Sequence, residues 1–175
     1  MKILETDRLI LREVDSAGDA EFIFRLLNSP KFIKYIGDRG VRSVDDARDF
    51  IEHRYRQSYR DNGFGLYTVE LKLSAEPVGI CGFVRRDTLP APDVGFAFLP
   101  EHEGKGYGFE SAAAAMKYGT ERLQFTNVLA ITTPDNEASG RLLKKLGFVF
   151  ERLIENGGET LKLFSYESKD STLSR

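Results

Sequence analysis

The sequence predicts a mixed α/β (α+β) fold, and two observations carry that prediction. Segments whose apolar residues recur every second position alternate irregularly with segments whose apolar residues recur every three to four positions, in the order β α α β β β α β α β β. This order lacks the strict alternation of strand and helix that a doubly wound parallel sheet requires. In addition, short polar links join two pairs of expected strands directly, which is typical of β-hairpins.

The first expected strand spans residues 8–14, where apolar and polar side chains alternate. The pair Asp15–Ser16 then offers N-cap side chains for a helix that ends before Pro30. A second helix is expected to begin at Ser43, because Asp46 three residues later completes a pattern similar to a capping box. That helix ends at the turn sequence Asp-Asn-Gly.

The middle of the chain predicts three consecutive strands and a helix. Residues 64–73 and 77–85 form an expected hairpin around a short Ser-Ala-Glu link. Residues 93–99 form the next strand and lead into a glycine-rich turn. The helix after the turn contains four consecutive alanines, Ala112–Ala115, which favour helix and let it approach a sheet closely.

The last part of the chain predicts a strand, a short helix and a closing hairpin. The strand spans residues 127–132. Asn136 caps the helix at its start, and Gly147 stands where a C′ glycine is expected. Residues 148–154 and 160–167 form the hairpin around an Asn-Gly-Gly turn.

Composition bounds the class of protein. The 175 residues, 41% of them hydrophobic, predict one domain over residues 1–167 with a polar, disordered tail over 168–175. The 25 Lys and Arg nearly balance the 27 Asp and Glu, whereas a nucleic-acid-binding protein usually has a basic excess, so no nucleic-acid partner is expected. Without an apolar run of membrane length or a signal-peptide core, no membrane partner and a cytoplasmic location are expected. The single Cys81 and two histidines predict no disulfide and no metal site.

The most informative segment is the glycine-rich turn between an expected strand and an expected helix. Its residues are Glu103, Gly104, Lys105, Gly106, Tyr107 and Gly108. Three alternate glycines allow a ligand close to the backbone, and the first turn of the helix adds unpaired N–H groups and a partial positive charge. The segment therefore predicts either a phosphate cradle or a tight turn that needs glycine for steric reasons alone.

Two familiar nucleotide-binding loops do not match this spacing. A Walker A loop requires Gly-x-x-x-x-Gly-Lys-Ser/Thr, but Gly104-Lys105 is followed by Gly106 and lacks the upstream glycine. A dinucleotide fingerprint requires Gly-x-Gly-x-x-Gly, and Phe109 or Ser111 occupies the third glycine position in the two possible registers.

Four spaced motifs resemble the GNAT N-acetyltransferase superfamily, with similarity over about residues 5–167. They are the strand DVGFAFLP with the turn EHEGKGYG, an alanine-rich helix, the strand NVLAIT, and Asn136-x-x-Ser139-x-x-Leu142-Leu143-x-Lys145-Leu146-Gly147-Phe148. The opening Thr6-Asp7-Arg8-Leu9-Ile10-Leu11-Arg12 is similar to the branch that includes the ribosomal-protein N-terminal acetyltransferases. The resemblance implies a mixed, mostly antiparallel central sheet of six to seven strands, flanked by about four helices.

The resemblance also implies the reaction. Acetyl-CoA would be the cosubstrate, with no metal, and the acetyl group would move by direct attack in a ternary complex to a primary amine. The acceptor, a protein N-terminus or a small-molecule amine, stays open, as does the choice between a monomer and a homodimer. A non-catalytic acyl-CoA-binding or interaction module with the same fold is the alternative.

Residue by residue, the resemblance places the cosubstrate on the glycine turn and on two neighbouring segments. The family's loop has Gln or Arg where this chain has Glu103, so binding is expected to depend on the backbone of the residues that follow. The expected binding residues are Phe98, Leu99, Glu103, Gly104, Lys105, Gly106, Tyr107, Gly108, Phe109, Asn136 and Ser139. Phe98 and Leu99 would lie beside the pantetheine arm through their backbone, and Asn136 would hydrogen-bond to it.

Two residues are the candidate catalytic groups. Asp93 matches a family carboxylate on the strand that enters the turn, and would accept the amine proton directly or through water. Ser139, one helical turn after Asn136, would donate to the leaving sulfur, with Tyr166 as the alternative acid. His102 borders the turn and is expected to be a surface residue.

Overall fold

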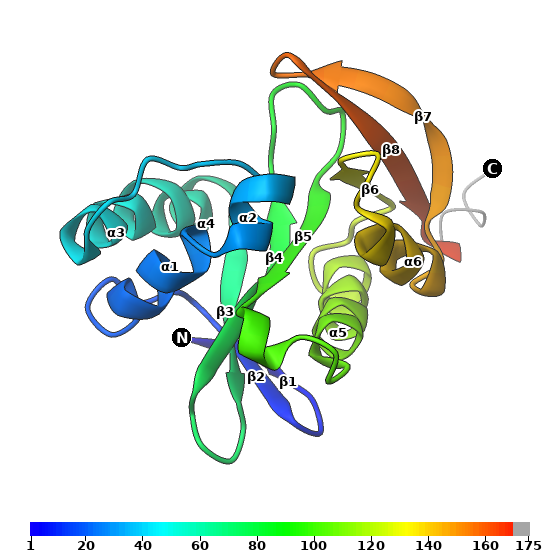
Figure 1. Ribbon diagram of the computed structural model, residues 1–175. Helices are drawn as coiled ribbons and strands as arrows, with labels where there is room; N and C mark the ends of the chain where they lie inside the picture. The colour runs from blue at the N-terminus through cyan, green and yellow to red at the C-terminus, as the bar shows by residue number, and fades with distance from the viewer. Residues whose placement is uncertain (170–175) are drawn as a thin grey trace.

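The strands of the computed structural model, which describes residues 1–169 of the 175, form one sheet in the order β1-β2-β3-β4-β5-β6-β8-β7 (Figure 1). Every neighbouring pair is antiparallel except β5 and β6, which are parallel. The strands are β1 (Lys2–Glu5), β2 (Leu9–Arg12), β3 (Leu66–Leu71), β4 (Pro77–Val84), β5 (Asp93–Phe98), β6 (Asn127–Thr132), β7 (Val149–Asn156) and β8 (Glu159–Glu167). The mixed, mostly antiparallel sheet is confirmed, but residues 1–169 contain eight strands rather than six to seven.

Strand β1 is the one that the sequence analysis missed. Its four residues are too few to show a clear alternation of apolar and polar side chains. It becomes a strand because it pairs with β2, with Leu4 opposite Leu11. The Thr6 N–H closes the turn between the two strands on the Leu9 carbonyl at 2.9 Å. Tertiary pairing rather than local pattern therefore forms this strand.

Within the described residues, five α-helical bodies flank the sheet, one more than expected, and a short 3-10 helix (Pro100–His102) follows β5. The five bodies are α1 (Ala20–Leu27), α2 (Pro30–Tyr35), a continuous helix made of α3 (Val44–Phe50), a π-helical stretch (Ile51–Arg56) and α4 (Gln57–Asn62), α5 (Tyr107–Glu121) and α6 (Glu137–Lys145). The additional helix is α2. Pro30 not only marks the end of the preceding helix, as expected, but also opens α2, where a missing N–H costs nothing.

The helix caps agree with the sequence at Ser43, at Gly147 and, as described below, at Asn136, and they differ at Asp15–Ser16. Ser43 Oγ accepts the N–H of Asp46 at 3.0 Å, as the capping pattern predicts. Gly147 ends α6 with φ +97°, which favours glycine. The expected capping of the first helix by Asp15–Ser16 is wrong, because α1 begins only at Ala20 and the Asp15 carboxylate instead accepts the N–H of Gly18 at 2.6 Å.

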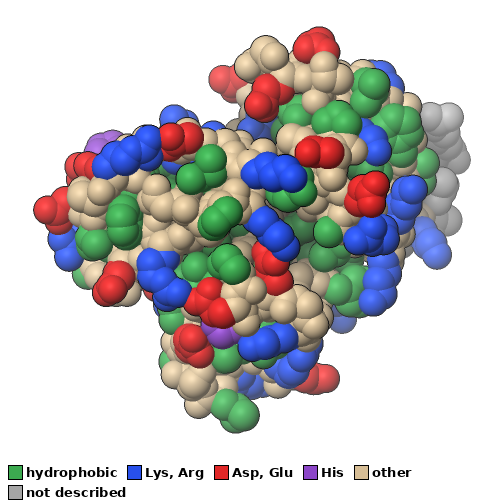
Figure 2. Space-filling view, viewed as in Figure 1, with side chains coloured by type: hydrophobic (Ala, Val, Ile, Leu, Met, Phe, Trp, Pro, Cys, Tyr) green, Lys and Arg blue, Asp and Glu red, His purple; other side chains and the backbone are tan. Residues whose placement is uncertain are grey.

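The two faces of the sheet carry different helices (Figure 1). Helices α5 and α6 pack on one face, where the core includes Val94, Ala112 and Val128. Helices α1 to α4 cover the other face, where the core includes Ile23, Ile80 and Leu99. On that second face, β6 and β8 are covered by the loop after β4 instead of a helix. Charged side chains of both signs are interspersed over the visible surface (Figure 2).

The alanines of α5 let this helix lie close to the sheet. Ala112 and Ala115 are fully buried against the sheet. Further along the helix, a Cβ at Gly119 would lie only 2.6 Å from the ring of Phe83. Small residues on this face of α5 therefore allow a short distance between α5 and β4.

Strand β8 ends at Glu167, and the expected polar tail begins at the next residue. The Ser168 N–H donates to the Thr126 carbonyl at 2.9 Å, so the polar tail expected over 168–175 still follows the sheet at its first residue. The rest of that expectation, over 170–175, lies outside the described residues. Among residues 1–169, no helix has both the length and the apolar character needed to cross a membrane.

Candidate active site

The parallel strands β5 and β6 separate almost as soon as they meet. Their only paired positions are Asp93 and Leu129, and the Leu129 N–H donates to the Pro92 carbonyl at 2.9 Å. Beyond this point, the edge of β5 that faces β6 has no partner strand, although β5 stays paired with β4 as far as Phe98. The sheet therefore opens between β5 and β6, with backbone groups left to bind another molecule.

The glycine turn lies directly after the open end of β5. Gly104 and Gly106 have φ of +73° and +82°, a backbone region that favours glycine. A Cβ at Gly104 would meet nothing within 4 Å, so the backbone there is accessible. Gly106 is the N-cap residue of α5, and no side chain caps this helix. The first N–H groups of α5 and the positive end of its dipole are thus available at this turn, as the phosphate-cradle interpretation requires.

Arg8, which lies between β1 and β2, forms hydrogen bonds that stabilise the glycine turn. Its Nη1 donates to the Lys105 carbonyl at 2.9 Å, and its Nε donates to Glu110 Oε2 at 2.7 Å. Thr6 Oγ1 donates to Glu110 Oε1 at 2.6 Å. Burial would raise the pKa of Glu110, but these donors outweigh it and hold the pKa below the ordinary value. In the sequence, Thr6 and Arg8 are recognisable only as part of a family motif, and their bracing role follows from these contacts.

Phe98, which ends β5, and Leu99, which follows it, lie on opposite faces of the sheet. The Phe98 side chain packs on the α5 face, and a Cβ at Gly108 would lie 3.7 Å from its ring and 3.1 Å from Leu142. Gly108 thus lets β5, α5 and α6 meet closely. Leu99 is buried on the opposite face, and its N–H donates to the Val78 carbonyl at 2.9 Å. The Leu99 carbonyl accepts the N–H of His102 at 3.0 Å, so both backbone polar groups of Leu99 already have partners within the protein.

Glu103, the departure from the family's loop, has a partner that the sequence analysis did not identify. Lys31 of α2 forms an ion pair with its carboxylate. The hydrogen bond and the charge of Glu103 raise the pKa of Lys31. Glu103 is thereby directed toward α2 and its charge is compensated beside the turn.

Helix α2 also reaches the opposite side of the opening. Lys34, one helical turn after Lys31, lies 4.0 Å from the Asp135 carboxylate. Asp135 follows β6, whereas Glu103 follows β5. Helix α2 therefore connects both segments that leave the opened strands.

The start of α6 places Asn136 and Ser139 together. Asn136 Oδ1 accepts the N–H of Ser139 at 3.2 Å, which makes Asn136 the helix cap. Within residues 1–169, neither the Asn136 amide nitrogen nor the Ser139 hydroxyl has a hydrogen-bond partner, so both remain available to a ligand. The cap and the ligand-binding roles expected for Asn136 are compatible.

Two threonines at the end of β6 were missed by the sequence analysis. Thr132 is 8% exposed, and the Oγ1 atoms of Thr132 and Thr133 are buried without a hydrogen-bond partner in the described structure. By alternation along β6, Thr132 lies on the α5 face together with Ala130. A buried hydroxyl without a partner is costly, so this position fits the polar arm of a bound cosubstrate. The sequence did contain a signal for them, because two consecutive threonines end an otherwise apolar strand.

Asp93 lies where the two strands meet. It is 2% exposed, and Arg86 Nε donates to its Oδ1 at 2.9 Å. Burial raises the pKa of Asp93 to about 6, although the charge and hydrogen bond of Arg86 oppose the shift. By alternation along β5, Asp93, Gly95 and Ala97 share one face, and Ala97 packs with the α1–α4 core. Asp93 therefore lies on the face opposite α5.

Four further residues that the sequence singled out have partners within the protein or are buried. The Tyr166 ring lies 5.6 Å from that of Phe148. His102 is 8% exposed, so its expected place on the surface is wrong; its Nε2 lies 3.1 Å from Glu76 Oε1. The Lys145 ammonium lies 4.1 Å from the ring centre of Phe109. The buried thiol of Cys81 has its pKa raised to about 12 by burial, as an inert core cysteine would.

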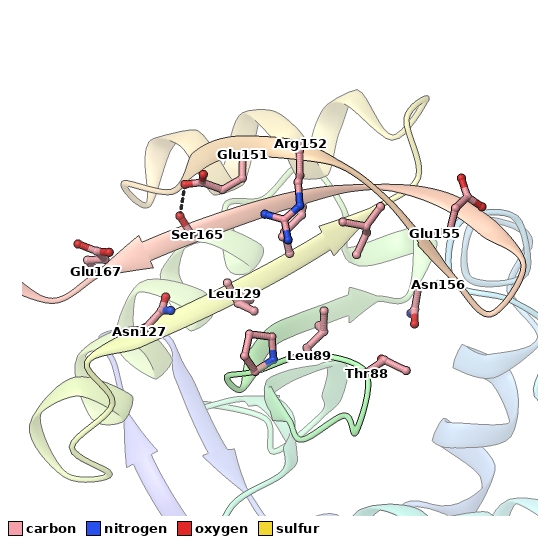
Figure 3. A pocket seen from close by; sticks show the side chains of 13 residues that line it. Thr88, Leu89, Asn127, Leu129, Glu151, Arg152, Glu155, Asn156, Ser165 and Glu167 are labelled. Atoms are coloured by element: carbon pink, nitrogen blue, oxygen red, sulfur yellow. Dashed lines mark hydrogen bonds between the residues drawn. The ribbon is translucent and has the colours of Figure 1, made fainter.

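Two surface grooves adjoin these residues. One, of about 580 Å³, lies outside the glycine turn between Arg8, Gly106 and Lys145. The other, of about 450 Å³, lies between the β7–β8 hairpin and the loop after β4 (Figure 3). Its wall includes Leu129, the partner of Asp93, and Arg152 points into it from β7 (Figure 3). Among residues 1–169, no three His, Cys, Asp or Glu side chains gather as metal ligands would.

The sequence is similar to a family of acetyltransferases. The family model described as "Acetyltransferase (GNAT) domain" matches residues 8–149. The uncharacterised N-acetyltransferase YoaA of Bacillus subtilis is 31% identical over 87% of this chain and 85% of its own length. The [ribosomal protein uS5]-alanine N-acetyltransferase of Escherichia coli is 33% identical over 49% of this chain and 43% of its own.

Solved structures have the same fold. An acetyltransferase from Agrobacterium tumefaciens superimposes with a TM-score of 0.80 at 23% identity, over 96% of this chain and 95% of its own. RimL, a ribosomal L7/L12 α-N-protein acetyltransferase solved with coenzyme A, gives 0.81 at 18% identity, over 95% and 98%. With a family model that covers most of its length and a relative as similar as YoaA, this chain belongs to the GNAT acetyltransferase family.

Proposed function

We propose that the protein is an acetyl-CoA-dependent N-acetyltransferase that moves an acetyl group to a primary amine by direct attack in a ternary complex. The observation that carries the proposal is the single paired position between β5 and β6, which leaves an open strand edge beside the glycine turn. The unpartnered hydroxyls of Thr132 and Thr133 support binding of a polar arm in this opening. When bound there, acetyl-CoA supplies an activated thioester.

The first chemical requirement is a free amine. An alkylamine with a pKa of about 10.4 costs about 4–5 kcal/mol to deprotonate at pH 7, and an α-amine with a pKa of about 8 costs about 1–1.5 kcal/mol. Asp93, with its pKa raised to about 6, is ionised at pH 7 and more basic than an ordinary aspartate. We assign Asp93 as the base, acting directly or through a water molecule.

The second requirement is stabilisation of the charges that develop. N–H groups on the unpaired edge of β5 after Asp93 are the candidate donors to the carbonyl oxygen during attack. The Ser139 hydroxyl, free of partners in the described residues, is the candidate donor to the leaving thiolate. Tyr166 is the weaker candidate, because its ring packs against Phe148 and Gly147.

The acceptor amine belongs to one of two groups. The relatives named for ribosomal proteins uS5 and L7/L12 favour a protein N-terminus. A neighbour of the same fold named spermidine N-acetyltransferase favours a small-molecule amine. A non-catalytic module with the same fold is the alternative, to which the unusual Glu103 at the turn gives weight; its ion pair with Lys31 compensates that charge and so favours the enzyme.

The test is an acetyl-transfer screen over small amines and N-terminal peptides that follows thiol release from acetyl-CoA. We expect rapid thiol release either with the small amines or with the N-terminal peptides, and much slower release with the other of these two groups. Asp93→Asn is the matched variant that should lose transfer but retain CoA binding, because Asp93 lies away from the glycine turn. Tight CoA binding without thiol release for any amine would replace the enzyme by the non-catalytic module.

A further inference from the structure

Strand β7 forms one edge of the sheet and carries much of the exposed apolar surface. The sheet order ends with β8 and β7, so the outer edge of β7 has no partner strand in the described part of the chain (Figure 1). Three of the seven exposed large hydrophobic side chains in that part belong to β7, namely Val149, Phe150 and Leu153, which are 62%, 45% and 56% exposed. The other edge strand, β1, has four residues against eight in β7, and its end residues Lys2 and Glu5 form an ion pair. Strand β7 is therefore the edge that is available to pair with another strand.

A β-bulge sets which way the side chains of β7 point. Phe150 and Arg152 lie opposite consecutive residues of β8, so Glu151 between them is the extra residue of the bulge. The side chains of Glu151 and Arg152 both line the groove between the β7–β8 hairpin and the loop after β4 (Figure 3). In a regular strand, two consecutive side chains would point to opposite faces.

Before the bulge, the two side chains of β7 lie on different faces of the hairpin. Val149 is opposite Ser165 of β8, which lines the groove, and directly opposite side chains share a face. The Phe150 ring lies 5.8 Å from the ring of Phe164, which belongs to the core on the α5 face. Val149 is thus on the groove face, and Phe150 is on the other face.

After the bulge, the same faces follow in reverse order. Arg152 and Ile154 line the groove, and Leu153 between them points to the other face. From residue 149 to residue 154 the faces are therefore groove, other, groove, groove, other, groove, which reads the same in both directions. The side chains match in the same way, since Val149 corresponds to Ile154, Phe150 to Leu153, and Glu151 to Arg152. This segment is self-complementary about a point between Glu151 and Arg152.

We propose that the protein forms a homodimer in which the β7 strands of two copies pair in antiparallel orientation about a twofold axis between Glu151 and Arg152. Residues directly opposite each other in an antiparallel pair share a face, and the bulge lets β7 meet this condition with itself. Glu151 then lies opposite Arg152 of the partner subunit, and Phe150 lies opposite the partner subunit's Leu153. The twofold symmetry forms each of these contacts twice.

The two charged residues at the centre are available for this contact. Among residues 1–169, neither Glu151 nor Arg152 forms an ion pair, and Glu151 Oε1 accepts only the Ser165 hydroxyl, at 2.5 Å. Charged side chains and bulges often protect an edge strand from pairing. Charges of one sign would protect an edge from its own copy, whereas Glu151 and Arg152 have opposite signs and complement a second copy. Because the pairing is short, we expect a dimer that dissociates on dilution.

The experiment measures the dimer dissociation constant of the full chain by sedimentation equilibrium, which does not depend on any activity. Glu151→Arg and Arg152→Glu each place like charges opposite each other twice, so we expect each to raise the dissociation constant by about tenfold or more. The double variant Glu151→Arg/Arg152→Glu restores opposite charges at the same positions. Its dissociation constant should therefore return to within about threefold of the wild type.

Glu155→Arg is the matched control for charge. Glu155 is an exposed glutamate of the same strand, and it accepts a hydroxyl hydrogen bond from β8 at 2.5 Å, as Glu151 does. It lies outside the self-complementary segment, so its variant should keep the dissociation constant within about twofold of the wild type. For the apolar contacts, Leu153→Ser should weaken the dimer several-fold, and Leu73→Ser, at an exposed leucine between β3 and β4, should not.

Three results would overturn the proposal. The first is a wild type that stays monomeric up to about 1 mM protein. The second is a dimer that neither charge reversal weakens, because its interface would lie elsewhere. The third is a double variant as weak as the single ones, because Glu151 would then not pair with Arg152 of the partner subunit. Circular dichroism of each variant checks that the fold is kept, as expected for exposed side chains.

Discussion

At the scale of single residues, Glu103 shows how a departure from a family pattern is accommodated. A carboxylate next to a phosphate cradle is unfavourable, but Lys31 compensates its charge and holds it toward α2. No local signal connects the two residues, which are 72 positions apart in the chain. The sequence identified the unusual residue but could not identify its partner, because the partner is brought close only by the fold.

This ion pair predicts a pattern in CoA affinity. We expect Lys31→Met to weaken CoA binding several-fold, because it leaves Glu103 uncompensated beside the turn, and Glu103→Gln to keep or improve it. The double variant should return close to wild type, in line with the about 0.2–1 kcal/mol of an exposed pair. Calorimetry measures the four affinities, with Lys2→Met as the control, since Lys2 is an equally exposed lysine paired with Glu5. A double variant as weak as Lys31→Met would mean that Lys31 binds the cosubstrate itself.

Asp93 predicts a pH dependence. A base with a pKa of about 6 takes up a proton below that pH, so we expect wild-type kcat/KM to fall on the acid side with an apparent pKa near 6. Asp93→Asn should lose about 10²–10⁴-fold near pH 7 and recover partly as rising pH deprotonates the amine. Asp87→Asn, at an exposed aspartate of the loop that precedes β5, is the control. A profile of Asp93→Asn that overlays the wild type would remove Asp93 as the base.

At the scale of elements, the glycine turn was predictable and its supports were not. Alternate glycines before an alanine-rich helix indicate a cradle, and the φ angles of Gly104 and Gly106 agree with that interpretation. The brace from Arg8 and the cover by α2 depend on β1 and on a helix that opens with Pro30, both of which local patterns failed to indicate. Elements that form through pairing or capping across the chain leave a weak signal in sequence.

The cradle predicts a selective loss in a glycine variant. We expect Gly106→Asp to abolish measurable CoA binding, because the new side chain would begin 3.2 Å from Arg8 and place a negative charge at the start of α5. Gly63→Asp is the matched control: Gly63 has φ +76° against +82° at Gly106, ends α4 and has open space around its Cβ. Both variants carry similar backbone strain, so retained CoA affinity in Gly106→Asp would overturn the cradle assignment.

At the scale of the whole molecule, a buried ion pair attaches the start of α1 to the sheet. Arg12 of β2 forms two hydrogen bonds with Asp19, at 2.7 and 2.9 Å, and its Nε donates to Glu70 of β3 at 2.6 Å. Asp19 precedes α1 and also accepts from the Thr68 hydroxyl at 3.0 Å. The sequence alone did not explain why Arg12 is part of the opening motif. The structure gives Arg12 a role, because it connects Asp19, before α1, with Glu70 of the sheet.

This bridge predicts how stability depends on pH. Burial would raise the pKa of Asp19, but the donors from Arg12, Asp15 and Thr68 hold it below the ordinary value of 3.8. A lowered pKa contributes stability that is present above 3.8 and is lost as pH falls through the folded value. The raised pKa of Asp93 acts in the opposite direction, because its contribution is present below 3.8 and is lost as pH rises through about 6.

We therefore expect Asp19→Asn to lower the free energy of unfolding at pH 7 by about 3 kcal/mol, at the low end of the cost of breaking a buried pair, because Glu70 still compensates Arg12. The difference from wild type should shrink as pH falls below 3.8, where the wild-type carboxylate also gains a proton. Urea unfolding at a series of pH values measures it, with Asp45→Asn as the control, because an exposed pair on one helix contributes at most about 0.5 kcal/mol. A difference that stays constant from pH 7 to pH 3 would mean that the charge of Asp19 does not attach α1 to the sheet.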